Sequence, residues 1–392
     1  METLLVAAVV LAGLALTATM HVCQRRLLAS PAAAPEPPLP PVSVLKPLKG
    51  VDADLEENLA SFFRLDYPRY ELLFGVDDPA DPALPVVRAL AARHPAVPCR
   101  IIADARRVGF NPKVNNLANL DRHARHEVMW ISDSNTRVAP TTLTDLVAQL
   151  ELPGVGLVSS PFRGIAVTQL GSAMEALQLN TFVMGGVAAV HRLWGGVCVV
   201  GKSMLLRRTT LAALGGFAFL ARFLAEDQVC GEEVARSGQR VAVAPVCIDN
   251  VLGRVTVRAF LTRHLRWARI RRRMNPAAYT GELLLNPVFV ALVGMLALRN
   301  WESSALFGVA LVAKSTLDAM TERAIGVVRP LYRYPALTLA KDLLVGVVWL
   351  VPFFSTVVVW RGNRLRVGPR TLLVPVEVAA PTLGRTTPVE TA

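Results

Sequence analysis

The chain has 392 residues, of which 53% are hydrophobic and 18% are charged. An ordinary soluble domain carries about 25% charged residues, so this composition excludes a disordered chain and favours a membrane protein with one sizeable folded domain. Lys and Arg outnumber Asp and Glu by 42 to 30, which gives a net charge of +12. The basic runs flank apolar segments and no nucleic-acid-binding motif accompanies them. We therefore expect contact with a membrane and no nucleic-acid partner.

The five cysteines are scattered along the chain and include no CxxC pair. Their odd number and spacing argue against a disulfide framework and against a structural zinc site. A reduced, cytosolic environment for the main domain is the simplest interpretation.

Residues 1–24 predict a transmembrane anchor, because their apolar run reaches the lower limit of about 17 residues for a span. Glu2 precedes this run, whereas Arg25 and Arg26 follow it. A cleaved signal peptide would begin with basic residues instead. The charges favour an uncleaved anchor with its N-terminus outside and the following domain in the cytoplasm. The proline-rich segment 25–41 is predicted to be a stiff linker.

Short apolar runs alternate with helical patterns between residues 42 and 275. Strands that alternate with helices of this length indicate βαβ units, so we predict an α/β domain with a mostly parallel sheet. Ligands of such sheets bind beyond the carboxyl ends of the strands. The predicted strands are 42–48, 71–76, 99–103, 127–132 and 155–160, and the predicted helices are 54–65, 82–94 and 141–150.

Residues 276–366 are predicted to form membrane helices, and residues 367–392 a disordered tail. The candidate spans are Leu283–Leu298, Ala305–Met320 and Leu343–Trp360. Three full crossings would leave the basic tail outside, against the charge rule. Lys314 and Asp318 lie four residues apart in the middle run, and an ion pair inside a membrane is costly unless protein shields it. We therefore favour a middle segment that is re-entrant or interfacial, with its ion pair facing protein.

Two acidic clusters follow predicted strands. Asp78 and Asp81 come after the strand 71–76, and Asp133 comes after the strand 127–132. Such carboxylates suit a nucleoside-diphosphate site, where one accepts hydrogen bonds from the nucleoside and the other holds a divalent cation. Aspartate is also common in turns, so either cluster alone is compatible with a purely structural role.

Two further motifs carry charge. Asp227 begins a predicted helix after an apolar run, where a carboxylate either caps the helix or acts as a general base. Arg263 and Arg266 lie three residues apart beside Trp267. On a helix they share a face and could grip a diphosphate, or they could form a basic patch next to the membrane.

The segment from Gly196 to Ser203 fits the expression GxxxxGK[ST] of a phosphate-binding loop. Its Val-Cys-Val-Val run favours extended structure, whereas a phosphate loop needs turns followed by a helix. We predict a strand here, a structural role for Lys202 and no ATPase activity.

Taken in order, these motifs resemble the ceramide glucosyltransferase family, glycosyltransferase family 21, and its bacterial members, which are related to hopanoid glycosyltransferases. The resemblance covers about residues 42–275 and the anchor-and-tail layout. It rests on the following segments: VSVLKPLKGVDADLEENL from Val42, the acidic residues up to Asp81, VGFNPKVNNL from Val108, ISDSNTRV from Ile131, GKSM from Gly201, LAED up to Asp227, and RHLRW from Arg263.

The resemblance implies a GT-A type nucleotide-sugar-binding domain. It implies Asp227 as the catalytic base and Asp133 as the metal-binding residue, with Mg²⁺ or Mn²⁺ as cofactor. Only one carboxylate is available in the Asp-Ser-Asn form of this motif, which leaves metal dependence open. The donor-binding residues that it implies are Asp78, Asp81, Asp133, Lys113, Arg263, Arg266 and Trp267.

The expected activity is an inverting transfer of glucose from UDP-glucose to the primary hydroxyl of ceramide, at the cytoplasmic face of a membrane that is the inner membrane if the source is bacterial. A hopanoid glycosyltransferase that uses a UDP-N-acetylhexosamine is the alternative with the same chemistry. A processive polysaccharide synthase shares the RxxRW region but needs more and longer spans. A non-enzymatic membrane scaffold would need none of the acidic residues.

Overall fold

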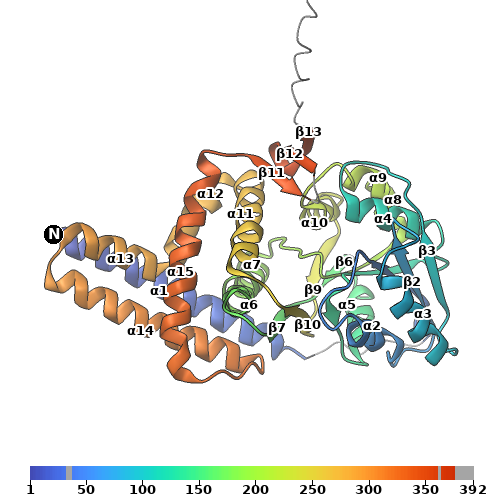
Figure 1. The fold of residues 1–392 in the computed structure, drawn as a ribbon, viewed down its shortest axis with the longest axis horizontal. Coiled ribbons are helices and arrows are strands. Elements are labelled where there is room, and N and C mark those ends of the chain that lie inside the picture. The colour runs from blue at the N-terminus through green and yellow to red at the C-terminus, as the bar shows by residue number, and fades with distance from the viewer. Residues whose placement is uncertain (32–37, 361–362, 376–392) are drawn as a thin grey trace, which may run out of the picture.

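The computed structural model describes residues 1–31, 38–360 and 363–375. A wound α/β domain forms one end of the molecule, and a group of long helices projects from the other (Figure 1). Residues 376–392, most of the predicted tail, lie outside the described residues.

The main sheet has seven strands in the order β3-β2-β1-β4-β8-β6-β9. Neighbouring strands pair in parallel except for β8, which is antiparallel to both β4 and β6. The predicted mostly parallel sheet is thus confirmed. The strands are β1 (Val42–Pro47), β2 (Tyr70–Val76), β3 (Cys99–Ala103), β4 (Val128–Ser132), β6 (Val155–Ser159), β8 (Ser203–Arg207) and β9 (Arg240–Val243).

Helices cover both faces of this sheet because its strands are apolar on both sides. In β2, Leu72 and Phe74 are buried in the core on one face, and Leu73 is buried in the core on the other. Alternation of side chains along a strand produces this division. Helices α2 (Leu55–Phe63), α3 (Ala83–Arg93) and α5 (Thr142–Leu150) pack on the first face; α4 (Pro112–Asp121), α8 (Arg208–Ala213), α9 (Gly216–Leu220) and α10 (Glu226–Arg236) pack on the second.

A second layer joins the sheet to the projecting helices. It holds a three-stranded sheet, β5 (Thr136–Arg137), β10 (Ile248–Gly253) and β7 (Phe162–Val167), with β10 in the centre. Beside it lie α6 (Leu170–Gln178), the π-helical turn η1 (Leu179–Val183), α7 (Met184–Trp194) and α11 (Val257–Met274). The strand predicted for the run after Gly196 is wrong, because residues 195–200 form a loop and β8 begins only at Ser203.

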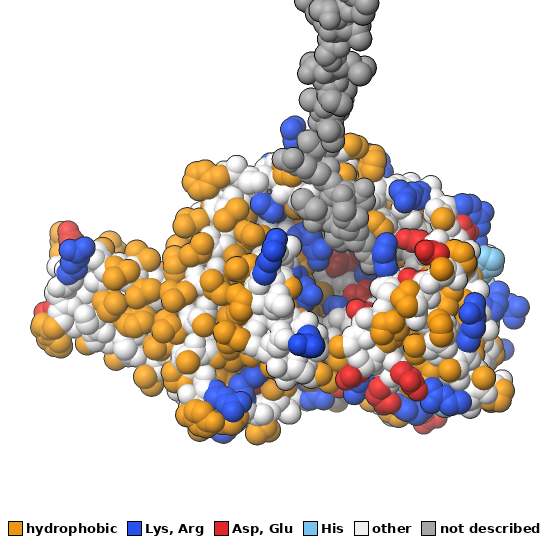
Figure 2. Space-filling view, in the orientation of Figure 1, with side chains coloured by type: hydrophobic (Ala, Val, Ile, Leu, Met, Phe, Trp, Pro, Cys, Tyr) orange, Lys and Arg blue, Asp and Glu red, His pale blue; other side chains and the backbone are white. Residues whose placement is uncertain are grey.

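Three helices lie side by side in the projection: α1 (Glu2–Leu28), α13 (Pro287–Leu298) and α14 (Trp301–Ala324). Apolar side chains cover much of their surface (Figure 2). Within the described residues, three helices are long and apolar enough to cross a membrane, and the bent pair Pro276–Leu285 and Pro287–Leu298 could supply a fourth span. One of the three, Leu170–Trp194, consists of α6, η1 and α7 of the second layer and is 72% buried over its most apolar window.

The ion pair predicted in the middle apolar run is present and faces protein. Lys314 and Asp318 of α14 are 3% and 0% exposed, and the Thr338 hydroxyl donates to Asp318 Oδ2 at 2.9 Å. Thr338 belongs to α15 (Tyr334–Leu350), which crosses the three projecting helices steeply in Figure 1. Protein therefore shields this pair from lipid, which lowers the cost of placing α14 in a membrane.

The C-terminal part of the chain differs from the prediction. The last apolar run does not form one helix: α15 ends at Leu350, and the strands β11 (Val357–Trp360), β12 (Asn363–Val367) and β13 (Leu373–Pro375) follow it. Hydropathy alone cannot separate a membrane helix from a helix followed by a buried strand. The predicted boundary between membrane helices and a disordered tail falls inside this sheet, which packs on Leu224, just before α10.

Candidate active site

Acidic and basic side chains from distant parts of the chain meet beyond the carboxyl end of β4. Figure 2 shows a hollow in the catalytic half, in the region of α10, where red and blue side chains gather. The members of the cluster come from the loop after β4, the first turn of α4, the loop before β8 and the start of α10. They are Asp133, Lys113, Lys202, Glu226 and Asp227.

Asp133 lies between two ammonium groups. Lys113 Nζ is 2.9 Å from its Oδ1 atom, and Lys202 Nζ is 3.1 Å from its Oδ2 atom. Burial opposes ionisation, but the two lysines outweigh it and hold the pKa of Asp133 well below its usual range. Asp133 is therefore ionised at neutral pH, and each of its oxygens already has a cationic partner.

The start of α4 positions Lys113. Asn111 caps the helix by accepting hydrogen bonds from the Lys113 and Val114 backbone N–H groups, and its amide donates to Glu226 Oε2 at 2.9 Å. Lys113 Nζ also donates to the Gly201 carbonyl at 3.0 Å and lies 3.3 Å from Glu226 Oε1. Despite burial, the surrounding carboxylates, Asp133 first, raise the pKa of Lys113, so this lysine stays charged.

Asp227 lies in the first turn of α10. Its Oδ2 atom accepts a hydrogen bond from Gly201 N–H at 2.6 Å, and its Oδ1 atom accepts one from Gln228 N–H at 2.8 Å. Burial and the adjacent Glu226 raise the pKa of Asp227 to about 6, against the pull of Lys113 and the two N–H groups. A carboxylate tuned toward neutral pH and held in place suits a general base.

Sequence reasoning missed two residues behind this cluster and gave a third a different role. Lys46, fully buried in β1, donates to the Asp133 carbonyl at 2.5 Å and to Thr136 Oγ1 at 3.1 Å. Asp52 accepts a hydrogen bond from the Ser134 hydroxyl. Lys202, predicted to be structural, contacts Asp133. The available signal was the presence of all three in the segments that carry the family resemblance.

The two aspartates after β2 are not part of the cluster. Asp81 accepts hydrogen bonds from Gly50 N–H at 3.0 Å and Ala83 N–H at 2.9 Å, so it joins the loop after β1 to the start of α3. Asp78 is exposed and accepts a hydrogen bond from Ala80 N–H. Strand β1 separates their strand from β4 in the sheet. A direct donor-binding role of Asp78 remains a prediction, whereas the Asp81 carboxylate is engaged by backbone.

Two of the residues predicted on α11, Arg263 and Trp267, make contacts outside the Asp133 cluster. Arg263 Nη1 lies 2.9 Å from Oε1 of the buried Glu175 on α6, so this guanidinium pairs within the second layer. Trp267 packs against the main core and meets His264 edge-on, with ring centroids 5.2 Å apart. Arg266 is half-buried on the same helix. The structure does not bring Arg263 to Asp133, so its diphosphate role remains a prediction.

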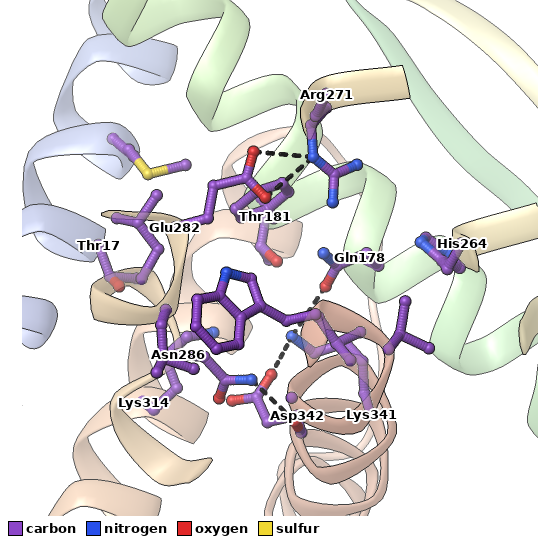
Figure 3. Close-up of a pocket in the computed structure, with 18 residues that line it drawn as sticks. Thr17, Gln178, Thr181, His264, Arg271, Glu282, Asn286, Lys314, Lys341 and Asp342 are labelled. Carbon is purple, nitrogen blue, oxygen red and sulfur yellow. Dashed lines mark hydrogen bonds and ion pairs between the residues drawn. The ribbon is translucent and has the colours of Figure 1, made fainter. Parts of the chain in front are cut away.

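A second polar cavity lies where the projecting helices join the catalytic half (Figure 3). Arg271 of α11 pairs with Glu282 at 2.8 Å, and Lys341 of α15 donates to Gln178 of α6 at 3.2 Å and pairs with Asp342. Apolar side chains complete the lining. The cavity therefore offers both polar and apolar surface next to helices that are candidates for membrane contact.

Asp133 is the predicted metal ligand, and the donor set tests that prediction. Mg²⁺ and Ca²⁺ take oxygen ligands at about 2.0–2.6 Å. Both Asp133 oxygens already face ammonium groups, and Asn135 Oδ1 accepts a hydrogen bond from Lys202 at 2.7 Å. Among the described residues, no group of three or more His, Cys, Asp or Glu side chains could hold a metal ion. The residues as arranged here do not fit a divalent cation.

The mostly parallel sheet with carboxylates beyond β4 is the arrangement of a GT-A-like nucleotide-sugar glycosyltransferase. A mannosyltransferase from Pyrobaculum calidifontis, solved in complex with GDP-Man and Mn²⁺, matches 90% of this chain and 99% of its own with a TM-score of 0.51 at 21% identity. At this identity the likeness concerns the fold. The chain belongs to the family described as Glycosyl transferase family 21, which matches residues 5–373.

Characterised relatives carry the same family name that the motifs suggested. Ceramide glucosyltransferase 1 of Caenorhabditis elegans is 28% identical over 347 residues, which cover 85% of this chain and 72% of that protein. Ceramide glucosyltransferase 3 of the same organism is 30% identical, over 61% of this chain and 52% of its own length. The ceramide glucosyltransferase of Komagataella phaffii is 28% identical over 60% of this chain and 58% of its own. The predicted family resemblance is thus confirmed.

Proposed function

We propose that this protein transfers glucose from UDP-glucose to the primary hydroxyl of ceramide, with inversion at the anomeric carbon. The observation that carries this proposal is Asp227, an oriented carboxylate with a pKa of about 6, beside the two half-buried cations Lys113 and Lys202. Membership of family 21 and the ceramide glucosyltransferase relatives support the choice of donor and acceptor.

The proposed chemistry is a single in-line displacement. The acceptor oxygen forms a bond to the anomeric carbon as the bond from that carbon to the phosphate oxygen breaks, and UDP leaves with the electron pair. Asp227 takes the proton of the hydroxyl. The ammonium groups at Asp133 stabilise the negative charge that develops on the leaving diphosphate, which is where such groups lower a barrier most.

The acceptor is proposed to reach Asp227 from the side of the cavity in Figure 3. The loop before β8 links the two regions. Its Cys198 and Val200 pack against a hydrophobic cluster that shares Met20, Phe182 and Leu285 with the cavity lining, and the next residue, Gly201, donates its N–H to Asp227. The cavity also borders α1 and α15, whose apolar surface suits the hydrocarbon part of a lipid. A lipid lying against these helices would direct its polar end toward the catalytic loop.

We further propose that the projection formed by α1, α13 and α14 lies in the membrane, so that the catalytic half lies in the cytoplasm. Of these helices, α1 is long and apolar enough to cross alone, and α13 reaches that length only together with the segment Pro276–Leu285. The free end of the projection carries Glu2, Arg299 and Glu302, which nearly balance. The end of the projection next to the catalytic half is strongly positive, with Arg25 and Arg26 at the end of α1 and the arginines of α11. The positive-inside rule then places this end of the projection in the cytoplasm.

The test is product formation by the purified protein. We expect a glucosylated ceramide, identified by mass spectrometry, when UDP-glucose and ceramide are supplied in detergent micelles. A panel of UDP-glucose, UDP-galactose and UDP-N-acetylglucosamine against ceramide and a hopanoid polyol tests the donor and the acceptor separately. Transfer of N-acetylglucosamine to the hopanoid alone would instead support the hopanoid glycosyltransferase, and no transfer with any pair would contradict both.

A divalent cation at Asp133 was predicted for this reaction, and the mannosyltransferase that shares the fold was solved with Mn²⁺. Because the Asp133 oxygens are paired with lysines here, no step of the proposed mechanism depends on a metal ion.

A further inference from the structure

Lys202 occupies the position on Asp133 that a bound cation would take. Its Nζ atom lies 3.1 Å from Asp133 Oδ2 and donates to Asn135 Oδ1 at 2.7 Å. A carboxylate oxygen and an amide oxygen two residues apart are ligands of the kind that a hard divalent cation takes. We propose that the Lys202 ammonium replaces a divalent cation at this site and binds the diphosphate of the donor, so that nucleotide binding does not depend on a metal ion. This inference rests on the proposed use of a UDP-sugar.

The charge balance of the site supports this substitution. A divalent cation on two carboxylates is a neutral unit, and one ammonium on one carboxylate and one neutral amide is also neutral. The chain has Asn135 rather than an acidic residue at the second position, which matches a cation of charge +1. Lys113 and Glu226 form a second neutral pair beside it, at 3.3 Å. Asp227 then remains as the one acidic group of the cluster that is not neutralised by a lysine, and a general base needs such a free negative charge.

The hydrogen-bonding capacity of the two lysines differs. An ammonium group has three N–H donors. Lys113 has three acceptors among the described residues: Asp133, Glu226 and the Gly201 carbonyl. The contacts of Lys202 within the same residues use two, and its side chain is 19% exposed. Lys202 therefore retains a donor for a phosphate oxygen, whereas Lys113 holds the carboxylates in place.

Hydrogen bonds to the cluster hold the loop that carries Lys202 in place. Gly201 donates its N–H to Asp227 and accepts from Lys113 through its carbonyl. The Ser203 hydroxyl, which would bind Mg²⁺ in a phosphate-binding loop, is buried and accepts a hydrogen bond from Trp130 Nε1 at 2.9 Å. The segment thus lacks the parts of an ATP site but presents its lysine to the cluster.

The experiment measures UDP binding to the full-length protein in detergent by isothermal titration calorimetry, with EDTA or with Mn²⁺. For the unaltered protein we expect dissociation constants that agree within about threefold. Lys202→Met should weaken binding in EDTA by roughly tenfold or more, the scale of a lost charge-assisted hydrogen bond. Mn²⁺ should then restore part of the affinity, because the substitution frees the Asp133 and Asn135 oxygens.

Two further variants serve as controls. Lys202→Arg keeps a cation and should stay nearer to the unaltered protein than Lys202→Met, and Arg93→Met removes an exposed cation of α3 and should bind UDP normally. If Lys202→Met does not fold, the comparison of EDTA with Mn²⁺ on the unaltered protein still tests whether UDP binding depends on a metal ion.

Loss of UDP binding by the unaltered protein in EDTA, with recovery in Mn²⁺, would overturn this inference alone. Normal UDP binding by Lys202→Met in EDTA would also overturn it. Absence of UDP binding under both conditions would instead contradict the proposed function, and with it this inference.

Discussion

The neighbours of a side chain in this site determine its pKa more than its residue type does. Asp133 and Asp227 are both aspartates of one cluster, yet two lysines lower the pKa of the first, whereas burial and Glu226 raise the pKa of the second to about 6. When the environments of two carboxyl groups give them different pKa values, the two groups are expected to have different roles. We therefore propose that Asp133 stays ionised and orders the lysines, and that Asp227 is the group that exchanges a proton near neutral pH.

The general-base assignment predicts the behaviour of Asp227→Asn. This change keeps the size of the side chain and removes its ability to accept a proton. Turnover should fall by roughly a hundredfold or more, the usual contribution of general acid–base catalysis, while UDP affinity stays within a few fold. Steady-state kinetics and calorimetry on the same preparation measure both quantities. Near-normal turnover in the folded variant would contradict the assignment.

The raised pKa of Asp227 also predicts the pH dependence of the reaction. Below its pKa of about 6 the carboxyl is protonated and cannot take the proton of the hydroxyl, so activity should be lost as the pH falls through this value. We expect kcat/KM to drop by about tenfold per pH unit below the midpoint. The residual activity of Asp227→Asn should lack this dependence. A flat profile down to pH 4.5 would show that another group acts as the base.

At the scale of elements, the ends of helices and loops bring the site together. The backbone of Gly201 passes so close to the cluster that a Cβ atom there would lie 2.8 Å from Lys113 Nζ and 3.0 Å from Asp227 Oδ2. Gly201→Ala should therefore reduce turnover by about tenfold or more, because small displacements of positioned groups are costly. Gly308→Ala is the matched control, since its Cβ would meet open space. Equal activity of the two variants would mean that the loop adapts freely.

The turn between the C-terminal strands β12 and β13 supports the start of α10, the helix that carries Asp227, from outside the main sheet. The Thr371 carbonyl and hydroxyl accept hydrogen bonds from the Leu224 and Ala225 N–H groups, immediately before Glu226 and Asp227. Thr371 holds a left-handed backbone, with φ of 64°, which is unfavourable for a β-branched residue. Structural constraint of this kind gathers near functional sites.

This support can be tested with Thr371→Val, which keeps the shape but leaves the buried Ala225 N–H without its acceptor. We expect a loss of stability of about 1–3 kcal/mol, seen as a lower melting temperature, and slower turnover with less change in UDP affinity. Thr142→Val is the control, because its buried hydroxyl has no hydrogen-bond partner among the described residues. Unchanged stability and turnover in Thr371→Val would show that the C-terminal strands do not hold the catalytic helix.

The sequence predicted the central elements well because their periodicity is local. Strand β3 coincides with its predicted range, and β4 differs by one residue. The pairing of Lys202 with Asp133 could not be predicted, because the two residues lie on segments that only the antiparallel pairing of β8 with β4 brings together. The C-terminal sheet was missed for a similar reason: its apolar residues face Leu224, more than a hundred residues earlier in the chain.

At the scale of the whole molecule, polar contacts hold the projecting helices against the catalytic half. Glu322 of α14 is fully buried and accepts hydrogen bonds from Asn180 of η1, Arg329 and the Tyr334 hydroxyl. Asn180 in turn donates to and accepts from the Gly164 backbone in β7. Such fully paired buried networks fix one arrangement of the elements around them. The position of the projecting helices relative to the site is therefore set by the fold.

The arrangement of the helices changes the expected topology. If α1, α13 and α14 all cross, the chain returns to the cytoplasm after α14. The segment Leu331–Phe353, which contains α15 and is itself long and apolar enough to cross, would then lie along the membrane surface, where the exposed Val347 and Phe354 would meet lipid. The C-terminal strands then stay on the cytoplasmic side, in agreement with the charge rule. This account allows the segment of Lys314 and Asp318 to cross and assigns the interfacial position to α15.

Cysteine labelling tests the topology. A membrane-impermeant maleimide applied to intact cells should label Asn300→Cys, in the turn between α13 and α14. It should label Arg366→Cys, an exposed residue of β12, only after permeabilisation. The unaltered chain, with its five native cysteines, gives the background. Labelling of position 366 from outside would mean that the C-terminal strands lie outside and that α15 crosses the membrane.

The central claim is that Asp227 drives a single displacement from a UDP-sugar to a lipid hydroxyl, and the anomeric configuration of the product tests it most directly. UDP-glucose carries its sugar in the α configuration, so one in-line displacement must give a β-linked glucosylceramide. Proton NMR of the purified product from the unaltered enzyme should show the β anomer alone, and Asp227→Asn should form almost none of it. An α-linked product would contradict the account.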